Sequence, residues 1–511
     1  MASGPGSAAV GRDNTGIVST GVNATNIQTV LPAQALRPVT EVVAPPRLVN
    51  VPFHSQVFVG RGGELAGMEA ALAEVGGVVV AAVHGLGGVG KSTLAARYAA
   101  SHADRLNPVW WITADTAAAL EAGLAALAAA LQPELARAVP LETLAQRATA
   151  WLAAHQGWLL VLDNVTDPAH VAPVLGRTLT GRVVVTSRLG EGWHRLGAQT
   201  LRLGVLTEEQ AVDLLTQIAA RDRPAADLDG GLDLVRELGC LPLAVEQAAA
   251  YLHQTHTTPR GYLDLLAQHP AVMYDQAAHG ADAERTIARI WRVTLDQLAD
   301  IPLVGRALRV LAWYAAEAIP RGLLKGLAEG PQLQQALGSL AAYNMITLDG
   351  DTIVVHRLVQ AVARTPDPGD PHRQDADIHT ACQHATTLLD QALPAAYRDP
   401  AGWPAWRRLL PHIDALTGHA PADTDTATTD RLLNNTGLFL RDQGTVGRAI
   451  TYHQRSLTAS QRLHGEDHPD TLVSRNNLAG AYETAGDLGR AIPLYEQTLT
   501  ERVRVLGEDH P

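Results

Sequence analysis

The sequence contains very little cysteine. Cys240 and Cys382 are its only two thiols, too few for a disulfide framework. It also lacks any apolar run close to the roughly 20 residues that span a bilayer. The N-terminus shows no basic segment followed by an apolar one, so no signal peptide is expected. Together these absences predict a cytoplasmic protein without a membrane span.

Lysine is almost as scarce, because only Lys91 and Lys325 of the 40 lysines and arginines are lysines. Since the chain otherwise uses arginine as its cation, a lysine inside a glycine-rich loop indicates that its chemistry is required there. The formal net charge of −12 argues against a dedicated nucleic-acid surface, because binding a phosphate backbone needs a basic patch. No nucleic-acid partner is therefore expected.

At 511 residues the chain is too long for one hydrophobic core, so three or more units are expected. Residues 1–45 form a tail rich in small and polar residues, which holds no aromatic side chain and cannot build a core. Within it, residues 11–30 place β-branched side chains among Asn, Gln and Gly, with little charge and no proline. That composition is typical of segments that stack as cross-β, and a disordered tail is the other interpretation.

Residues 46–205 alternate between apolar strands and amphipathic helices. Such alternation predicts a parallel sheet flanked by helices, hence an α/β domain. The helices are expected over residues 90–101, 117–131 and 141–155. The strands are expected over residues 77–83, 108–112, 158–162, 182–186 and 199–203.

After residue 206 the strands largely stop, and a capping box at Thr207 begins a small helical domain that extends to residue 283. Residues 284–366 combine helices with a short strand pair around an Asp-Gly-Asp turn at 349–351, which indicates a winged helix. Residues 367–428 are expected to form a helical linker. The remainder of the chain is therefore predicted to be mostly helical.

Residues 429–511 repeat with a period of 42 residues, since the motif GEDHP occurs at 465–469 and again at 507–511. Each unit reads as two amphipathic helices joined near Gly444 or Gly486, which predicts an α-solenoid. Such arrays normally need at least three units. The array is thus expected either to be truncated or to be unusually short.

The strongest motif is GLGGVGKST at residues 85–93, which matches the P-loop pattern G-x-x-x-x-G-K-[ST] between a predicted strand and a predicted helix. Glycines let backbone N–H groups close around phosphate oxygens, and the start of the next helix attracts the anion. The lysine would reach the β- and γ-phosphates, and the serine would ligate Mg²⁺. The expected ligands of ATP or ADP are Gly85, Gly87, Gly88, Gly90, Lys91, Ser92 and Thr93.

Asp163 ends an apolar strand in the Walker B pattern, where it either holds Mg²⁺ through water or caps a turn. With Ser92 it forms the predicted metal site. The next residue, Asn164, stands where many ATP-hydrolysing enzymes carry a second acid, and an amide cannot take a proton. We therefore expect at most a slow ATPase, with Lys91 and Asp163 as its catalytic residues. Arg188 ends another strand at this sheet edge, and either contacts the γ-phosphate or lies on the surface.

Together these motifs resemble, over about residues 50–365, the NB-ARC module of STAND-class signalling ATPases, which plant disease-resistance proteins and many actinobacterial NLR-like proteins share. The resemblance implies that Arg61 helps to hold the nucleotide from the strand that leads into the domain. It implies that Pro242 packs on the adenine and that His356 contacts the β-phosphate of ADP. The family's Met-His-Asp reads Val-His-Arg here, which leaves the capping role of its aspartate unsupported; a packing histidine is the alternative for His356. The motifs lie at residues 59–61, 85–93, 159–165, 183–188, 239–243 and 355–357.

The repeats resemble tetratricopeptide repeats of the kinesin-light-chain type, which implies a surface that binds a protein ligand. Residues 11–30 are similar to amyloid signalling motifs that precede bacterial NB-ARC proteins. These resemblances imply a switch that senses a ligand through its repeats, exchanges ADP for ATP and forms a homo-oligomer. Its N-terminal segment would then recruit an effector protein, in bacterial defence or regulated cell death.

Two other functions remain open at this point. An NB-ARC-type transcriptional regulator is disfavoured by the acidic balance of the chain. A plain metabolic P-loop ATPase is disfavoured by Asn164 and by the lack of a recognisable substrate-binding motif.

Overall fold

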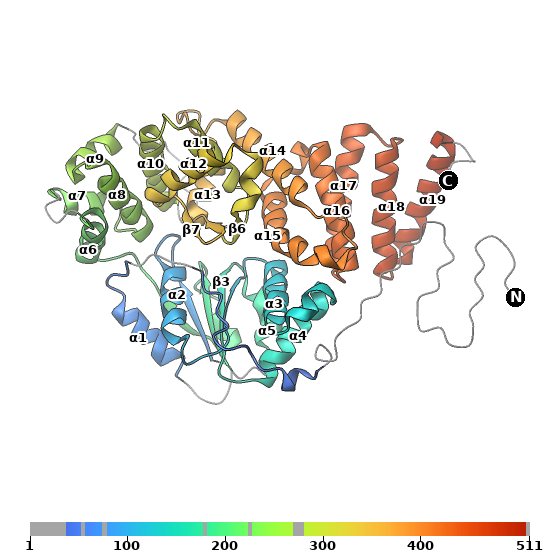
Figure 1. The fold of residues 1–511 in the computed structure, drawn as a ribbon, viewed down its shortest axis with the longest axis horizontal. Helices are drawn as coiled ribbons and strands as arrows, with labels where there is room; N and C mark the ends of the chain where they lie inside the picture. Colours follow the sequence, from blue (N-terminus) through green and yellow to red (C-terminus); the bar gives the residue numbers. More distant parts are fainter. Residues whose placement is uncertain are drawn as a thin grey trace, which may run out of the picture.

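A computed structural model describes residues 37–52, 57–73, 79–176, 181–222, 227–268 and 281–506. Figure 1 shows a sheet domain in blue to teal, two helical units in green and yellow next to it, and a row of helices in orange and red. The candidate amyloid segment, 11–30, and the last copy of the repeat motif, 507–511, lie outside the described residues. Within the described ranges no helix is long and apolar enough to cross a bilayer.

The sheet domain holds five parallel strands in the order β2-β3-β4-β1-β5. The predicted strands are confirmed, with small shifts at their ends. Successive residues of β3 and β4 are buried, as expected when helices cover both faces of a parallel sheet. The strands are β1 (Val79–His84), β2 (Val109–Thr113), β3 (Leu159–Val165), β4 (Arg182–Ser187) and β5 (Gln199–Arg202).

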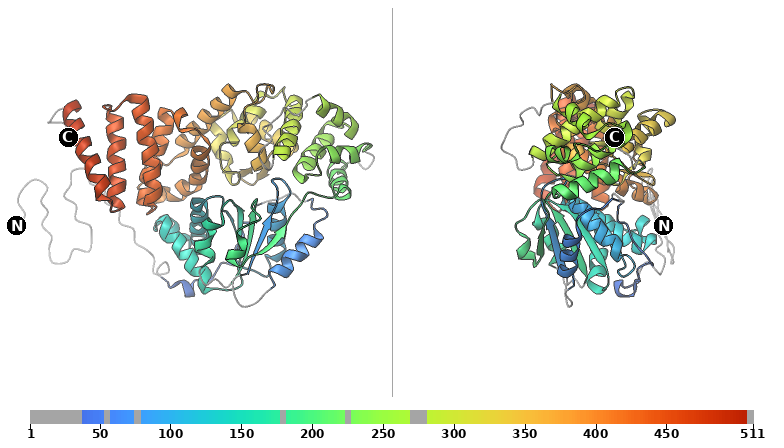
Figure 2. Two further views of the ribbon diagram at one scale, coloured as in Figure 1. Left: turned by 180° about the vertical axis from the view of Figure 1, so that it is seen from behind. Right: turned by 90° about the vertical axis from the view of Figure 1, so that its left-hand side faces the viewer.

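The helices of this domain begin where the sequence supplies start signals. Thr116 caps α3, because its side chain accepts a hydrogen bond from the N–H of Ala119 at 3.0 Å. Asp167 caps α5 in the same way, and a proline follows it at the first helical position. Figure 2 shows the domain from behind and from the side. Its helices are α1 (Gly62–Ala71), α2 (Lys91–His102), α3 (Ala117–Leu131), α4 (Leu141–Ala154) and α5 (Pro168–Leu175).

Part of the segment predicted as a tail belongs to the sheet domain. Val42 is buried, and its carbonyl accepts a hydrogen bond from Trp151 Nε1 at 2.7 Å. The carbonyl of Arg37 accepts another from Arg147 at 2.6 Å. The predicted boundary at residue 45 is therefore too late, because Val42, with Val39 and Ala44 packed beside it, and these backbone carbonyls attach the stretch to the sheet domain.

The helical unit begins with the predicted capping box. Thr207 Oγ1 accepts from the N–H of Gln210 at 3.2 Å, and Gln210 Oε1 accepts from the N–H of Thr207 at 3.0 Å. Gln210 Nε2 also donates to the carbonyl of Gly60 at 2.8 Å, which ties this unit to the start of the sheet domain. Its helices are α6 (Glu208–Ala219), α7 (Gly231–Glu237), α8 (Pro242–Thr255) and α9 (Pro259–Ala267).

The winged helix carries the predicted hairpin and one strand more. β7 (Thr347–Asp349) and β8 (Thr352–Val354) pair antiparallel around Gly350, which has a positive φ of 54°. A third strand, β6 (Ile319–Pro320), pairs with β8 and was not predicted, because two residues carry no periodic pattern. The helices are α10 (Ala281–Gln297), α11 (Pro302–Leu311), α12 (Gly330–Ala342) and α13 (Arg357–Arg364).

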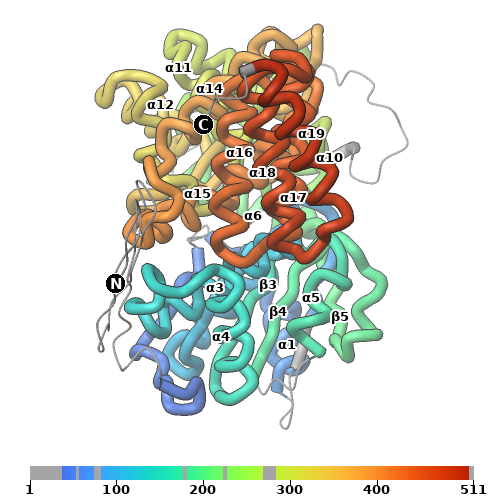
Figure 3. Tube along the Cα trace, turned by 90° about the vertical axis from the view of Figure 1, so that its right-hand side faces the viewer, coloured from blue at the N-terminus to red at the C-terminus, as the bar shows by residue number. Residues whose placement is uncertain are grey.

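Beyond the wing, α14 (Asp375–Ala392) and α15 (Trp403–His419) occupy the predicted linker and pack against each other. α16 (Ala427–Asp442), α17 (Val446–His464), α18 (Pro469–Thr484) and α19 (Leu488–Leu506) then form two helix pairs side by side, the repeat array in Figure 3. Both pairs turn at the predicted glycines, Gly444 and Gly486, which have φ values of 85° and 77°. The α-solenoid prediction is confirmed for these residues.

Candidate nucleotide-binding site

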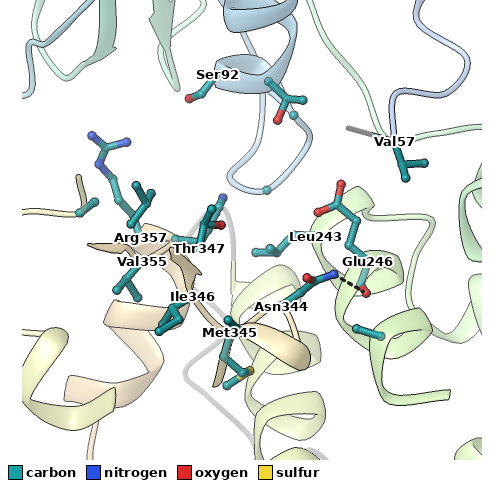
Figure 4. A pocket seen from close by; sticks show the side chains of 18 of the residues that line it. Val57, Ser92, Leu243, Glu246, Asn344, Met345, Ile346, Thr347, Val355 and Arg357 are labelled. Carbon is teal, nitrogen blue, oxygen red and sulfur yellow. Dashed lines mark hydrogen bonds between the residues drawn. The ribbon is translucent and has the colours of Figure 1, made fainter. Parts of the chain in front are cut away.

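A cavity of about 750 Å³ opens where the sheet domain, the helical unit and the winged helix meet. Its size lies within the roughly 300–1,000 Å³ that is usual for small-molecule sites. Figure 4 shows Ser92 on the P-loop side, Leu243 and Glu246 from α8, and Ile346 and Arg357 from the winged helix around it. The P-loop lines it with Gly87, Gly88, Gly90, Lys91, Ser92 and Thr93.

The P-loop connects the end of β1 to the start of α2, and three of its glycines, Gly85, Gly88 and Gly90, have a positive φ. Gly85 has a φ of 156°, and a Cβ atom there would lie 2.2 Å from the carbonyl oxygen of Leu203. Gly90 has a left-handed φ of 92° at the N-cap of α2. This path brings the start of α2, with its unpaired N–H groups, to the cavity, which suits an anion.

Lys91 folds back over its own loop. Its Nζ donates hydrogen bonds to the carbonyl oxygens of Gly85 at 2.9 Å and Leu86 at 2.7 Å. Burial, together with the nearby charge of Arg188, lowers the pKa of Lys91 to about 8, although the negative charge of Asp163 opposes the shift. A phosphate in the cavity would replace the two carbonyls as the partner of this ammonium group.

ATP binding is expected to weaken as the pH rises through about 8, the pKa of Lys91. Lys91 of the free protein loses its proton there, whereas bound phosphates favour the charged amine and raise its pKa. Binding above this pH therefore takes up a proton, and the dissociation constant should rise by up to about tenfold per pH unit. Calorimetry at pH 9, in two buffers with different ionisation enthalpies, measures the uptake. An absence of proton uptake at that pH would contradict the prediction.

Asp163 lies at the carboxyl end of β3, fully buried. Its Oδ1 accepts hydrogen bonds from Ser92 Oγ and Thr186 Oγ1, both at 2.6 Å. Its Oδ2 accepts one from Arg357 Nη1 at 3.2 Å. The structure thus brings the two predicted metal ligands, Ser92 and Asp163, into direct contact. One hydroxyl and one carboxylate, completed by phosphate oxygens and water, fit the oxygen-ligand preference of Mg²⁺.

Asn164 occupies a left-handed conformation with a φ of 59°, which asparagine tolerates better than most residues. Its N–H donates to Thr186 Oγ1 at 2.8 Å. The pairing of β3 with β4 shifts register between Leu162 and Val165, at this residue. The backbone therefore gives a reason for asparagine here, and its side-chain amide still offers no proton acceptor for water activation.

His356 and Arg188 both line the cavity, Arg188 from the end of β4 and His356 from the start of α13. His356 is the N-cap of α13, and its Nδ1 accepts a hydrogen bond from the N–H of Leu358 at 3.1 Å. Burial within the cavity walls, followed by the charge of Arg357, lowers the pKa of His356 below its ordinary value. A neutral ring with Nδ1 as acceptor carries its proton on Nε2, so His356 can donate to an anion.

Three residues with predicted nucleotide contacts, Gly85, Arg61 and Pro242, do not line the cavity. Residues 57–61 form no strand, and Arg61 is buried behind the P-loop. Its Nη2 donates to the carbonyls of Val89 at 3.2 Å and Gly204 at 2.7 Å, so it supports the loop instead of the ligand. Pro242 begins α8, and it is the next residue, Leu243, that faces the cavity.

Sequence reasoning missed several residues of the cavity wall, among them Val57, Leu243, Glu246 and Asn344. Glu246 follows Leu243 by about one helical turn, and Figure 4 shows its carboxylate pointing toward the P-loop. Burial raises the pKa of Glu246 to about 7. No motif marks these positions, because α8 is apolar on most of its surface, and only the packing of the three units selects the side that faces the cavity.

The chain matches two known families. Residues 64–224 match the NB-ARC domain, and residues 428–500 match the tetratricopeptide repeat. An NLR-like protein of Hyaloscypha variabilis is 27% identical over 441 residues, which cover 77% of this chain and 42% of that protein. The regulatory protein AfsR of Streptomyces griseus is 31% identical over 318 residues, 60% of this chain and 30% of that protein. The chain thus spans less than half the length of these relatives.

A STAND protein with a tetratricopeptide repeat sensor, from Pyrococcus horikoshii, superposes with a TM-score of 0.40 at 12% identity, covering 89% of this chain and 85% of that one. Residues 64–224 are an NB-ARC domain, residues 428–500 are tetratricopeptide repeats, and the chain is homologous to an NLR-like protein.

Proposed function

We propose that this protein is an ADP/ATP-dependent signalling switch whose closed arrangement is held by the nucleotide. The proposal rests on the residues that line the cavity, because they come from the P-loop, from α8 and from the winged helix. A nucleotide bound there contacts all three units at once. Exchange of ADP for ATP can therefore shift the protein between a closed and an open arrangement of the three units. The size of the shift is set by how differently each nucleotide binds the two arrangements.

The two ends of the cavity suit the two ends of a nucleotide. Lys91, Ser92 and Arg188 offer cations and a hydroxyl for the phosphates, and His356 adds a neutral donor from the winged helix. Ser92 and Asp163 would hold Mg²⁺, which neutralises phosphate charge when it is bound. Leu243 and other apolar side chains of the opposite wall provide the packing surface for a base. Asn164 limits water activation, so the protein is at most a slow ATPase.

The first repeat is attached directly to the sheet domain, which gives the repeats a route to the switch. Gln443, at the turn between α16 and α17, has no exposed surface, and its Oε1 accepts from the N–H of Leu141 at 3.1 Å. Arg407 of α15 donates to the same Oε1 at 2.6 Å. It also donates to the carbonyls of Ala136 and Val139, at 2.8 and 2.6 Å. A ligand that moves the repeat array must break these bonds before the domains can separate.

Nucleotide-dependent assembly is the expected behaviour that tests this function. The full chain loaded with ADP should be compact and of a single size, because one nucleotide ties the three units together. Exchange for Mg²⁺ and a non-hydrolysable ATP analogue should shift it toward a homo-oligomer. Light scattering combined with small-angle scattering measures mass and shape in both states. Identical mass and shape with the two nucleotides would rule out the switch while leaving nucleotide binding intact.

The output of the switch stays a prediction. Recruitment of an effector would use residues 11–30, which lie outside the described residues, and a role in bacterial defence or cell death follows only from the family resemblance. A protein ligand for the repeats and a cytoplasmic location likewise remain predictions from the sequence.

A transcriptional regulator remains the second candidate, because a protein named as a regulatory protein is 31% identical over 318 residues. The net charge of −12 weighs against it. A DNA-binding assay on the full chain at two salt concentrations separates the two functions, since contacts with phosphates weaken as salt rises.

A further inference from the structure

The carboxylate of Asp163 is engaged by donors of the protein itself. Ser92 and Thr186 donate to Oδ1, each at 2.6 Å, and Arg357 donates to Oδ2 at 3.2 Å. The Asp163 side chain has no exposed surface, so these donors surround a buried charge. The carboxylate proposed above as a Mg²⁺ ligand is therefore already paired with a cation of another unit.

That cation is positioned by a second carboxylate. The Nη2 atom of Arg357 lies 3.8 Å from Glu317 Oε1. Glu317 Oε2 accepts from Thr113 Oγ1 at 2.7 Å and from Trp111 Nε1 at 3.2 Å, two side chains of β2. Figure 4 shows the Arg357 side chain extending from the winged helix toward the P-loop. The arginine and the glutamate thus join the winged helix to two strands of the sheet, at the edge where the metal would bind.

Mg²⁺ and the guanidinium group have charges of the same sign and require the same buried carboxylate. Lys91 and Arg188 already bring further positive charge to this cavity. Because low dielectric surroundings screen charges poorly, two cations on one buried carboxylate repel strongly. Mg²⁺ also requires nearly octahedral oxygen ligands at short distance, which a guanidinium group beside Asp163 obstructs. Loading of the metal must therefore displace Arg357.

We propose that Arg357 takes the place of Mg²⁺ at Asp163 while the winged helix is closed, so that closure and metal loading exclude each other. The inference rests on the proposed nucleotide site. It follows that ADP binds the closed protein with little help from Mg²⁺. A nucleotide that binds together with Mg²⁺ displaces Arg357 from Asp163, and the winged helix moves together with Arg357. This exclusion requires a cation at position 357, because the negative charge of Asp163 would repel an acidic residue there.

The test measures the dissociation constant of ADP for the full chain by calorimetry, once with excess Mg²⁺ and once with EDTA. In the unmodified protein the two values should be similar. In Arg357→Gln, Mg²⁺ should tighten ADP binding by about tenfold or more, because the carboxylate becomes free for the metal. Arg221→Gln is the matched control, since Arg221 also lines the cavity and the substitution removes the same charge without touching Asp163. Small-angle scattering on the same samples reports whether Mg²⁺ opens the domains.

Several results would overturn the inference. One is that Mg²⁺ strongly tightens ADP binding to the unmodified protein without any change in its shape. This result can be measured even if the variant does not fold. Another is an equal response of ADP binding to Mg²⁺ in Arg357→Gln and in the unmodified protein. A third is an equal response in Arg221→Gln and in Arg357→Gln. Arg357→Lys, which keeps a cation, should retain the weak response to Mg²⁺. A protein that binds no ADP under either condition would instead refute the proposed function.

Discussion

Replacing Lys91 with alanine is expected to abolish ATP binding. No other lysine lies in the P-loop, and its Nζ already reaches the loop carbonyls that a phosphate would replace. Each hydrogen bond to a charged group contributes roughly 1.5–3 kcal/mol, and Lys91 would serve two phosphates, so the loss should reach at least about a hundredfold in affinity. Equilibrium binding of a fluorescent ATP analogue to the full chain measures it.

The chain offers a matched control for this experiment in Lys325, its one other lysine. Lys325 is exposed on a short 3-10 helix of the winged helix (Arg321–Gly326) and does not line the cavity. Lys325→Ala should therefore bind ATP as the unmodified protein does. Since the partners of Lys91 are carbonyls of its own loop, Lys91→Ala should also unfold at nearly the unmodified temperature. Near-normal ATP affinity in a folded Lys91→Ala protein would remove the P-loop assignment.

Replacing His356 with alanine is expected to weaken ADP binding by about tenfold to a hundredfold while changing ATP binding less. The Nε2–H of a neutral His356 would donate to the β-phosphate and so hold the winged helix over ADP. Its pKa stays below the ordinary value because of burial and then the charge of Arg357, so the ring is a neutral donor at pH 7. Without it, the ADP-loaded protein should form larger assemblies, as measured by light scattering.

The structure adds a control that the sequence alone does not suggest. His356 also caps α13, so His356→Ala removes an N-cap as well as a phosphate donor. Loss of a cap costs about 1 kcal/mol of stability. His356→Asn keeps a capping acceptor but has a shorter side chain, so it should restore thermal stability without restoring ADP affinity. If Asn restores both, or if Ala keeps full ADP affinity and remains monomeric, His356 acts only in packing and capping.

Local sequence patterns were sufficient to predict much of the structure of this protein. Apolar runs predicted the strands of the sheet, because a parallel sheet covered on both faces buries every side chain of its central strands. The glycines and Lys91 of the P-loop predicted a phosphate site, since that chemistry depends on neighbouring residues in a single loop. The period of 42 residues predicted the repeat array, because each unit repeats the same contacts with the next one. In all three cases the signal in the sequence is local, although strands such as β1 and β4 then pair with partners far along the chain.

Contacts between distant segments could be known only from the tertiary structure. Arg357 pairs with Asp163 across 194 residues, and Gln443 caps Leu141 across 302. Leu243 faces the cavity where Pro242 was expected, and Arg61 turns behind the P-loop, because the packing of whole units sets which side of a helix or loop meets a ligand. A repeat period or a motif indicates which residues of a segment are buried, but not which distant segment packs against them. The sequence by itself therefore determined the parallel sheet, the repeat array and the phosphate loop, and only the tertiary structure decided which side chains of the other units close over that loop.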